Sequence, residues 1–204
     1  MTFRASPYDV VDASQRVWLE HWDPQSASGN AVFTAILRSH QMLMASVNEV
    51  MKAHGLTFAR YEVLAWLAAE PRSALTLSWI SEVLRIPPAT VTNLVDRLVT
   101  DGLILRVPHP TDARTTLAQL TPRGRKLFHA ATDDLNAEVY RPLALSEARR
   151  GDLVEVLREL RANAGEFDTE RSSERISRLA ARGGGEPADG DSVGREPAGG
   201  EPAG

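Results

Sequence analysis

Residues 87–102 have the sequence PPATVTNLVDRLVTDG, and this stretch decides the fold of the chain. Folded as a helix, it places small polar side chains on one side and an apolar stripe on the other. Pro88 suits the first helical position, because its missing N–H would have no intrahelical partner there. Gly102 suits the position just after the last turn, where glycine is common. The stretch therefore predicts one amphipathic helix with a polar, solvent-facing side.

A second helix and two short strands are predicted around this stretch. The shorter helix begins after Thr76, which serves as its N-cap, and runs through Arg85. The strands cover residues 103–107 and 115–120, and the stiff polar loop 108–114 joins them. Helix, turn, helix and a hairpin with a basic tip form a winged helix-turn-helix, a module that binds duplex DNA.

The rest of the chain is predicted to be helical up to residue 164. Helices are expected over 8–22, 31–54, 57–69, 122–140 and 146–164, with Asp23-Pro24 ending the first and 25–30 forming a polar connector. Apolar residues cover more than half the circumference of helix 31–54, so we expect burial on two sides, by its own core and by a second subunit. The predicted fold class is mainly α, a winged helix-turn-helix with long N- and C-terminal dimerisation helices and a two-stranded β-wing.

These elements suggest a domain organisation. Residues 1–30 form an N-terminal extension with a helix, 31–56 and 122–164 contain the dimerisation helices, 57–121 form the DNA-binding lobe, and 165–204 form an acidic tail rich in Gly, Pro and Ala. The end of this tail repeats a Glu-Pro-Ala unit and contains too little apolar surface to offset the entropy of ordering. We therefore expect the tail to be disordered.

The charge distribution is compatible with a nucleic-acid partner. The chain has a formal net charge of -4. Residues 183–204 alone carry five acids and one base, so the remainder of the chain is neutral overall. Residues 85–126 contain seven Arg or Lys residues against three Asp residues, a local net charge of +4. Local charge matters more than the total for contacts with phosphates.

Several function classes find no support in the sequence. There is no cysteine, which excludes disulfides, thiolate metal sites and thiol-based sensing. The five histidines are scattered without metal-ligand spacing, and there is no phosphate loop, nucleophile elbow or dinucleotide fingerprint. We expect no enzyme activity, cofactor or metal. Without a signal peptide or an apolar run of about 18 residues, we expect a cytoplasmic protein with no membrane partner.

Candidate DNA contacts lie on the polar side of the 87–102 helix and around the hairpin. They are Pro88, Thr90, Thr92, Asn93 and Arg97 on the helix, and Arg106, Asp112, Arg114 and Arg123 around the hairpin. Asn93 suits an adenine edge and Thr90 a thymine methyl group. Arg114 could enter the narrow minor groove, with Asp112 holding either the loop or an arginine in place. The alternatives are an ordinary solvated helix face and a surface salt bridge of small energetic value.

On these residues the chain resembles the MarR (multiple antibiotic resistance regulator) family. The resemblance is carried by residues 90–98, Asp101-Gly102-Leu103-Ile104, Arg106, the wing Pro110-Thr111-Asp112-Ala113-Arg114, and Leu120-Thr121-Pro122-Arg123-Gly124. It extends more loosely over about 31–164. It implies a homodimer that binds palindromic operator DNA, often as a repressor, with Asp112 and Arg114 as the wing pair. Asn93 departs from the family, in which many relatives carry a basic residue at this place.

The resemblance also implies a pocket for a small effector between the dimerisation helices and the DNA-binding lobe. The candidate pocket residues are Trp18, Trp22, His40, Met44, Phe58, Arg60, Tyr61 and Trp66. Arg60 suggests an acidic ligand and the rings an aromatic one, although aromatic and Met residues at helical spacing are more often core. The alternative function is a winged-helix dimeric scaffold for protein interactions, without an operator of its own.

Overall fold

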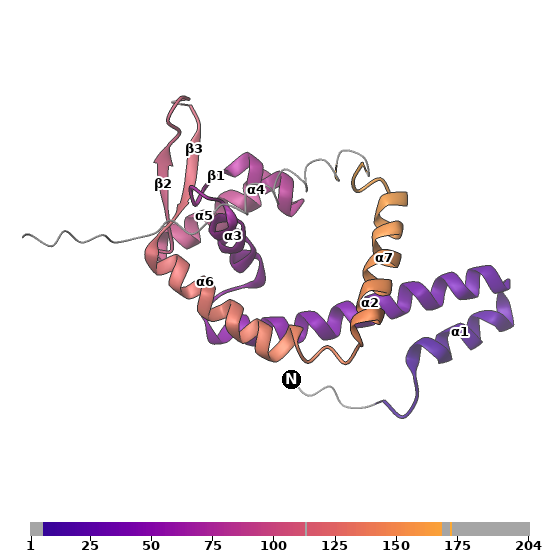
Figure 1. Cartoon of the computed structure of the whole chain (residues 1–204). Coiled ribbons are helices and arrows are strands. Elements are labelled where there is room, and N and C mark those ends of the chain that lie inside the picture. Colours follow the sequence, from indigo (N-terminus) through magenta and orange to yellow (C-terminus); the bar gives the residue numbers. More distant parts are fainter. Residues whose placement is uncertain (1–5, 113, 169–171, 173–204) are drawn as a thin grey trace, which may run out of the picture. The chain divides into compact units, whose positions relative to one another are not determined.

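The computed structural model describes residues 6–112, 114–168 and 172, and the chain divides into two compact units, 1–143 and 144–204. The first unit contains α1 (Val10–His21), α2 (Pro24–Ala53), α3 (Phe58–Ala69), β1 (Ala74–Thr76), α4 (Leu77–Leu84), α5 (Pro88–Thr100), β2 (Ile104–Pro108), β3 (Thr116–Leu120), α6 (Pro122–Leu135) and the π-helical turn η1 (Asn136–Tyr140). The second unit contains α7 (Glu147–Asn163). Figure 1 shows these helices and the small sheet, which confirm the mainly α, winged-helix fold class.

The core of the first unit is formed where α3, α4, α5 and the sheet meet the end of α2 and α6. Its fully buried side chains include Leu64 and Leu67 of α3, Ile80 of α4 and Ile104 of β2. The apolar stripe predicted for α5 is part of this core. Burial of these aliphatic side chains is the main favourable contribution to folding of the lobe.

Side-chain caps fix where the helices begin. Thr57, Thr76 and Thr121 each accept a hydrogen bond from the backbone N–H three residues on, and Ser146 does the same at the start of α7. The Thr76 cap is where the sequence predicts it, and the other three caps lie at the predicted starts of helices 57–69, 122–140 and 146–164. An N-cap can be predicted because its hydrogen bond is local and needs no partner from elsewhere in the fold.

The prediction of a connector over 25–30 is wrong, because α2 begins at Pro24. The Asp23 carboxylate accepts hydrogen bonds from the Ser26 N–H at 3.0 Å and the Ser26 hydroxyl at 2.6 Å, and Pro24 occupies the first helical position. The polar residues that follow are small enough to pack against α1. Ala27 is fully buried there, and the Ser14 hydroxyl donates to Asn30 Oδ1 at 2.8 Å.

The sheet has three strands in the order β1-β3-β2, whereas the sequence predicts only the two strands of the wing. The additional strand β1 pairs antiparallel with β3, and Leu75 lies opposite Ala118. Three residues are too few to show the alternation that identifies a strand, so β1 is defined by its partner. The predicted helix through Arg85 also ends one residue early, because Arg85 adopts a left-handed conformation with φ 54°.

The close approach of α6 to the backbone of Leu103, between α5 and β2, requires a glycine at position 124. A Cβ atom built there would lie 2.1 Å from the Leu103 carbonyl oxygen and 2.9 Å from Leu120 Cδ1. The Gly124 N–H also donates to the Thr121 cap at 2.9 Å, so the backbone cannot easily move away.

We expect Gly124→Ala to destabilise the protein by about 1–3 kcal/mol, the usual cost of overpacking a core. Gly151→Ala is the matched control, because nothing lies within 4 Å of the position of its Cβ in α7. In that open helical site alanine should instead stabilise the helix by about 0.5–1 kcal/mol. Urea unfolding at one fixed protein concentration measures both changes. Equal stability of Gly124→Ala and the parent chain would contradict the packing described for this site.

Candidate nucleic-acid interface

The helix α5 is anchored by one side and presents the other to solvent. Val91, Val95 and Leu98 are fully buried, and their spacing follows the helical repeat. The opposite side is exposed and consists of Pro88, Ala89, Thr90, Thr92, Asn93, Asp96, Arg97 and Thr100. All five residues predicted on this helix for DNA contact therefore lie together on one open face. We call this face the recognition face.

The recognition face carries several hydrogen-bonding groups beside an open hollow. Thr90, Asn93, Leu94, Asp96, Arg97 and Thr100 line an open hollow of about 560 Å³. The Thr92 hydroxyl donates to the Pro88 carbonyl oxygen at 3.1 Å, so its oxygen lone pairs and its methyl group remain for an outside partner. A base edge placed against this face would meet an amide, a methyl group and a hydroxyl oxygen.

An ion pair joins the recognition face to the wing. Arg106 Nη2 on β2 donates to Asp96 Oδ1 on α5 at 2.6 Å. Both side chains remain partly exposed, at 35% for Arg106 and 58% for Asp96, so the pair is worth little as a stabilising contact. Its effect is geometric, because it holds a cation beside the helix where a phosphate backbone would pass.

At the tip of the wing, Asp112 holds the loop rather than an arginine side chain. Its carboxylate accepts hydrogen bonds from the Thr115 hydroxyl at 2.6 Å and from the Arg114 backbone N–H at 3.0 Å. These two hydrogen bonds lower the pKa of Asp112 below its ordinary value of 3.8, and the bond from Thr115 makes the larger contribution. The contact with Arg114 uses only its backbone, and the residue is exposed at the loop tip.

Arg123 lies at the start of α6, where it adjoins the end of the recognition helix. It is exposed, and its Nη1 would lie 3.7 Å from a Cβ built on Gly102. Gly102 itself has φ 70°, as predicted for the residue that ends this helix. The predicted cations therefore come from α5, β2, the wing loop and α6, around a single helix.

The predicted pocket residues are distributed over three helices. Trp18 on α1 and Trp22, the C-cap residue of this helix, have ring centroids 5.9 Å apart, and Trp22 is 62% exposed. His40 is exposed on α2, and Met44 is partly buried on the same helix. Their role as ligand contacts stays a prediction.

The aromatic candidates on α3 pack against neighbouring rings. Tyr61 is buried, stacks between Phe58 and Phe128, and hydrogen-bonds Thr132 Oγ1 at 3.1 Å. Trp66 meets Trp79 edge to face, with ring centroids 5.4 Å apart. Tyr61 is therefore a core residue, in line with the alternative considered for such rings.

Arg60, the candidate for an acidic ligand, has partners within the chain. Its guanidinium contacts Asp101 at 2.8 Å and the Gly55 carbonyl oxygen at 2.6 Å. Thr115, Asp96 and Asp101 are not among the residues that the sequence predicts for the site. An Asp followed three residues later by Thr is a recognisable turn pattern, so Thr115 could have been found. The ion pairs of Asp96 and Asp101 span 10 and 41 residues, and no local pattern predicts them.

Two further properties concern the described residues only. No described helix is long and apolar enough to cross a membrane. Within residues 6–112, 114–168 and 172, no group of three or more His, Cys, Asp or Glu side chains could hold a metal ion.

Known proteins are similar to this chain in sequence and in fold. The model of the MarR family matches residues 54–115. Sco5413, a MarR family transcriptional regulator from Streptomyces coelicolor, has a crystal structure that is 42% identical in sequence; the match covers 69% of this chain and 98% of that chain, with a TM-score of 0.62. The HTH-type transcriptional regulator MhqR from Bacillus subtilis is 29% identical over 140 residues, 67% of this chain and 93% of MhqR.

A third similar protein has a described effector. BpsR from Bordetella bronchiseptica is 26% identical, with 63% of this chain and 91% of that chain covered and a TM-score of 0.55. The DNA binding of BpsR is described as regulated by 6-hydroxynicotinic acid.

The geometry of the wing predicts the titration of Asp112. The folded loop lowers the pKa of this carboxyl group, so the ionised carboxylate stabilises the fold. This contribution is present when the pH is above the ordinary pKa and is lost as the pH falls through the lowered pKa. Thr115→Val removes the main cause and should raise the Asp112 pKa toward 3.8, whereas Thr115→Ser keeps the hydroxyl and the low pKa. Carboxyl-carbon NMR titration measures both variants. An unchanged pKa in Thr115→Val would refute this description of the loop.

Proposed function

The chain belongs to the MarR family of transcriptional regulators, and we propose that it binds palindromic operator DNA as a homodimer and releases this DNA when a small ligand binds. The observation that carries the proposal is the recognition face of α5, which is open to solvent beside a basic wing. Regulation of nearby genes, most simply by repression, follows from occupancy of an operator. We assign this activity to the cytoplasm, where the proposed partner DNA would lie.

Each element of the lobe has a role in the proposed complex. The N-terminal end of α5 enters the major groove, where Thr90, Thr92 and Asn93 reach base edges. Arg97, Arg106 and Arg123 contact phosphates and supply affinity without sequence information. Arg114 enters the minor groove, where the negative potential is strongest, and the Asp112 turn keeps its loop in shape.

Exposed apolar surface on the first unit supports a homodimer. Large apolar side chains face solvent on α2 and at the end of α1, including Val32 at 55%, Phe33 at 66% and the C-cap residue Trp22 at 62% exposure. Isolated exposed apolar residues are normal, but a long series of them marks an interface. A second copy of the chain would cover this surface and bring two recognition faces into successive major grooves, about 34 Å apart.

The second unit has its own exposed apolar stripe on α7. Leu153, Val154, Val156 and Leu160 are between 48% and 63% exposed. The polar residues Glu155 and Arg158 form an ion pair on the same helix at 3.3 Å. We assign this stripe to the same homodimer.

The proposed ligand is a small aromatic or acidic effector, by analogy with the effect of 6-hydroxynicotinic acid on BpsR. Candidate contacts are the exposed Trp22 and His40 and the partly buried Trp18 and Met44. A ligand shifts the DNA-binding equilibrium only through a difference in affinity between two conformations of the dimer. The effector would favour the conformation whose two recognition faces have the wrong separation for the operator.

Binding to DNA from upstream of the chain's own gene tests the proposal against the interaction scaffold. We expect sequence-preferring binding that weakens steeply with salt, because phosphate contacts release counterions. Arg114→Ala should weaken it by about tenfold, the range for one groove contact. The control Arg16→Ala removes an exposed arginine on α1, paired with Asp12 at 2.9 Å, and should leave binding unchanged. Absence of sequence preference across genomic fragments at any salt concentration would favour the scaffold.

A single charge on α7 tests the homodimer. Val156→Lys places an ammonium group on the apolar stripe at a site that is 63% exposed in the single chain, so the fold of α7 should tolerate it. We expect the dimer to dissociate at least about tenfold more readily, because an unpaired charge buried at an interface costs more than 1.4 kcal/mol. Gly151→Lys introduces the same charge on the other side of α7, where nothing lies within 4 Å. Sedimentation equilibrium should show weakened association for Val156→Lys only. Equal association of both variants would show that α7 is not part of the interface.

A further inference from the structure

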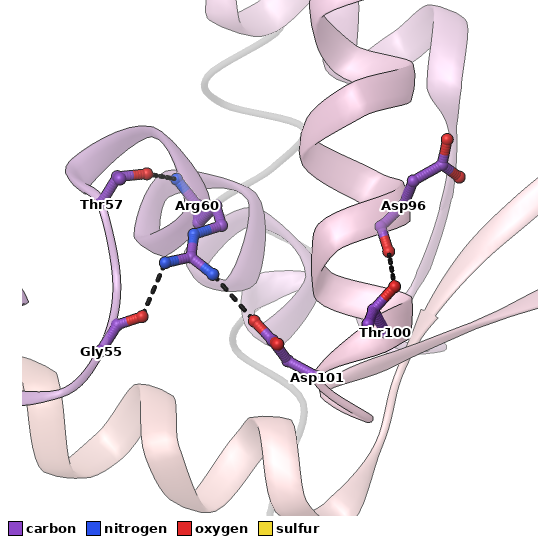
Figure 2. Close-up of polar contacts among 6 residues, drawn as sticks. All are labelled: Gly55, Thr57, Arg60, Asp96, Thr100 and Asp101. Atoms are coloured by element: carbon purple, nitrogen blue, oxygen red, sulfur yellow. Dashed lines mark hydrogen bonds and ion pairs between the residues drawn. The ribbon is translucent and has the colours of Figure 1, made fainter.

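We propose that Arg60 is a positioning residue for operator binding, which fixes the C-terminal end of the recognition helix α5 to the turn that follows the long helix α2. This inference rests on the proposed function and adds to it a residue outside the recognition face. The three connected parts are α3, which carries Arg60, the turn at Gly55, and Asp101 at the end of α5 (Figure 2). We call this set of contacts the Arg60 clamp.

The guanidinium group of Arg60 bonds two acceptors from different parts of the chain. Nη1 donates to Asp101 Oδ2 at 2.8 Å, and Nη2 donates to the Gly55 carbonyl oxygen at 2.6 Å. The Arg60 backbone N–H donates to Thr57 Oγ1 at 3.3 Å, within the cap of α3. The Arg60 side chain is only 17% exposed, so it is not presented as a free cation for a phosphate group.

Both acceptors are attached to rigid backbone. Gly55 has φ 67° in the turn that closes α2, where the Leu56 N–H donates back to Met51 at 2.9 Å. Asp101 is the C-cap of α5, and its N–H donates to the Arg97 carbonyl oxygen at 3.0 Å. A contact that joins two fixed turns determines where the end of α5 lies relative to the turn after α2. A contact between two mobile side chains would not do so.

The charge of Asp101 makes a nearby cation favourable. The C-terminal end of a helix carries a partial negative charge, so an aspartate in the C-cap position is unfavourable by itself. The guanidinium group compensates both the carboxylate and the helix end. Its planar fork also reaches two acceptors at once, which the single ammonium group of lysine does less well.

A second contact joins α5 to the wing, because the Asp96 carboxylate pairs with Arg106 of β2. Within α5 itself, the Thr100 hydroxyl donates to the Asp96 carbonyl oxygen at 2.9 Å (Figure 2). The final turns of α5 are therefore tied to α3 by Arg60 and to the sheet by Arg106. The 13 residues of α5 extend roughly 20 Å, so a small tilt at the clamped end displaces the DNA-contacting end by a larger amount.

The clamp also links the two surfaces that the proposed function requires. The turn at Gly55 follows α2, whose exposed apolar side chains we assign to the homodimer. Asp101 follows α5, which carries the recognition face. Loss of the clamp should therefore change how precisely α5 is placed relative to the dimer helix, while all groups that touch DNA remain.

The test uses the full-length dimer, Arg60→Met, Asp101→Ala and the double variant, with operator and random DNA compared over a salt series. We expect each single variant to lose about tenfold in operator affinity, and the double variant to lose no more than either, because both substitutions break one interaction. Arg60→Lys should recover part of the loss. Affinity for random DNA and the salt slope should not change, since no phosphate contact is removed.

Two controls separate positioning from other roles. Arg97→Met, on the recognition face, should weaken binding to both DNAs and reduce the salt slope by about one phosphate contact. Arg16→Met, which breaks the exposed pair with Asp12, should behave like the parent chain.

Amide hydrogen exchange of residues 98–102 should accelerate in Arg60→Met, while exchange of the buried α3 residues should not. This result would show local loosening of a protein that remains folded.

Several outcomes would overturn the inference. A reduced salt slope in Arg60→Met would identify Arg60 as a phosphate contact. Unchanged operator affinity in Arg60→Met and Asp101→Ala would show that the clamp does not position α5. Additive losses in the double variant would show that the two residues act independently. Absence of operator binding by the parent chain would instead refute the proposed function, and the inference with it.

Discussion

The burial of one side of α5 is the constraint on which the rest of the structure depends. Val91, Val95 and Leu98 are fully inside the core, and this determines which residues of the helix remain outside. Rotating the helix by one residue would expose part of this stripe and bury Asn93 or Asp96 without partners, at a cost of several kcal/mol. The recognition face is therefore defined by packing, before any contact with DNA is considered.

Polar contacts then place the recognition helix and the wing relative to each other. Each is partly exposed and weak as a source of stability, yet each joins elements that the core alone leaves adjustable. The Arg106–Asp96 pair connects α5 with β2, and the Arg60 clamp connects α5 with α3 and the turn after α2. The Asp112 carboxylate holds the loop that carries Arg114. Carboxylates thus have a structural role in a surface whose proposed partner, DNA, is itself negatively charged.

The helix α2 has a double function that explains its composition. Its last turns contribute Val47, Val50 and Met51 to the core of the lobe, whereas large apolar side chains nearer its start are exposed. One continuous helix therefore joins the DNA-binding lobe to the surface proposed for a second subunit. A change in how two subunits meet would be transmitted along α2 to the turn at Gly55, where the clamp begins.

The sequence by itself determined the features that depend on neighbouring residues. The cap at Thr76, the end of α5 at Gly102 and the exposed side of that helix follow from local hydrogen bonds and helical periodicity, and the structure confirms them. The start of α2 at Pro24 is also local, because Asp23 caps this helix through Ser26. Only the tertiary structure decided the strand β1 and the partners of Arg60 and Arg106. The strand β1 exists through its pairing with β3, and the arginine partners are distant in sequence. These features depend on contacts that form only when separate segments meet, so neither hydrophobic periodicity nor a helix cap predicts them.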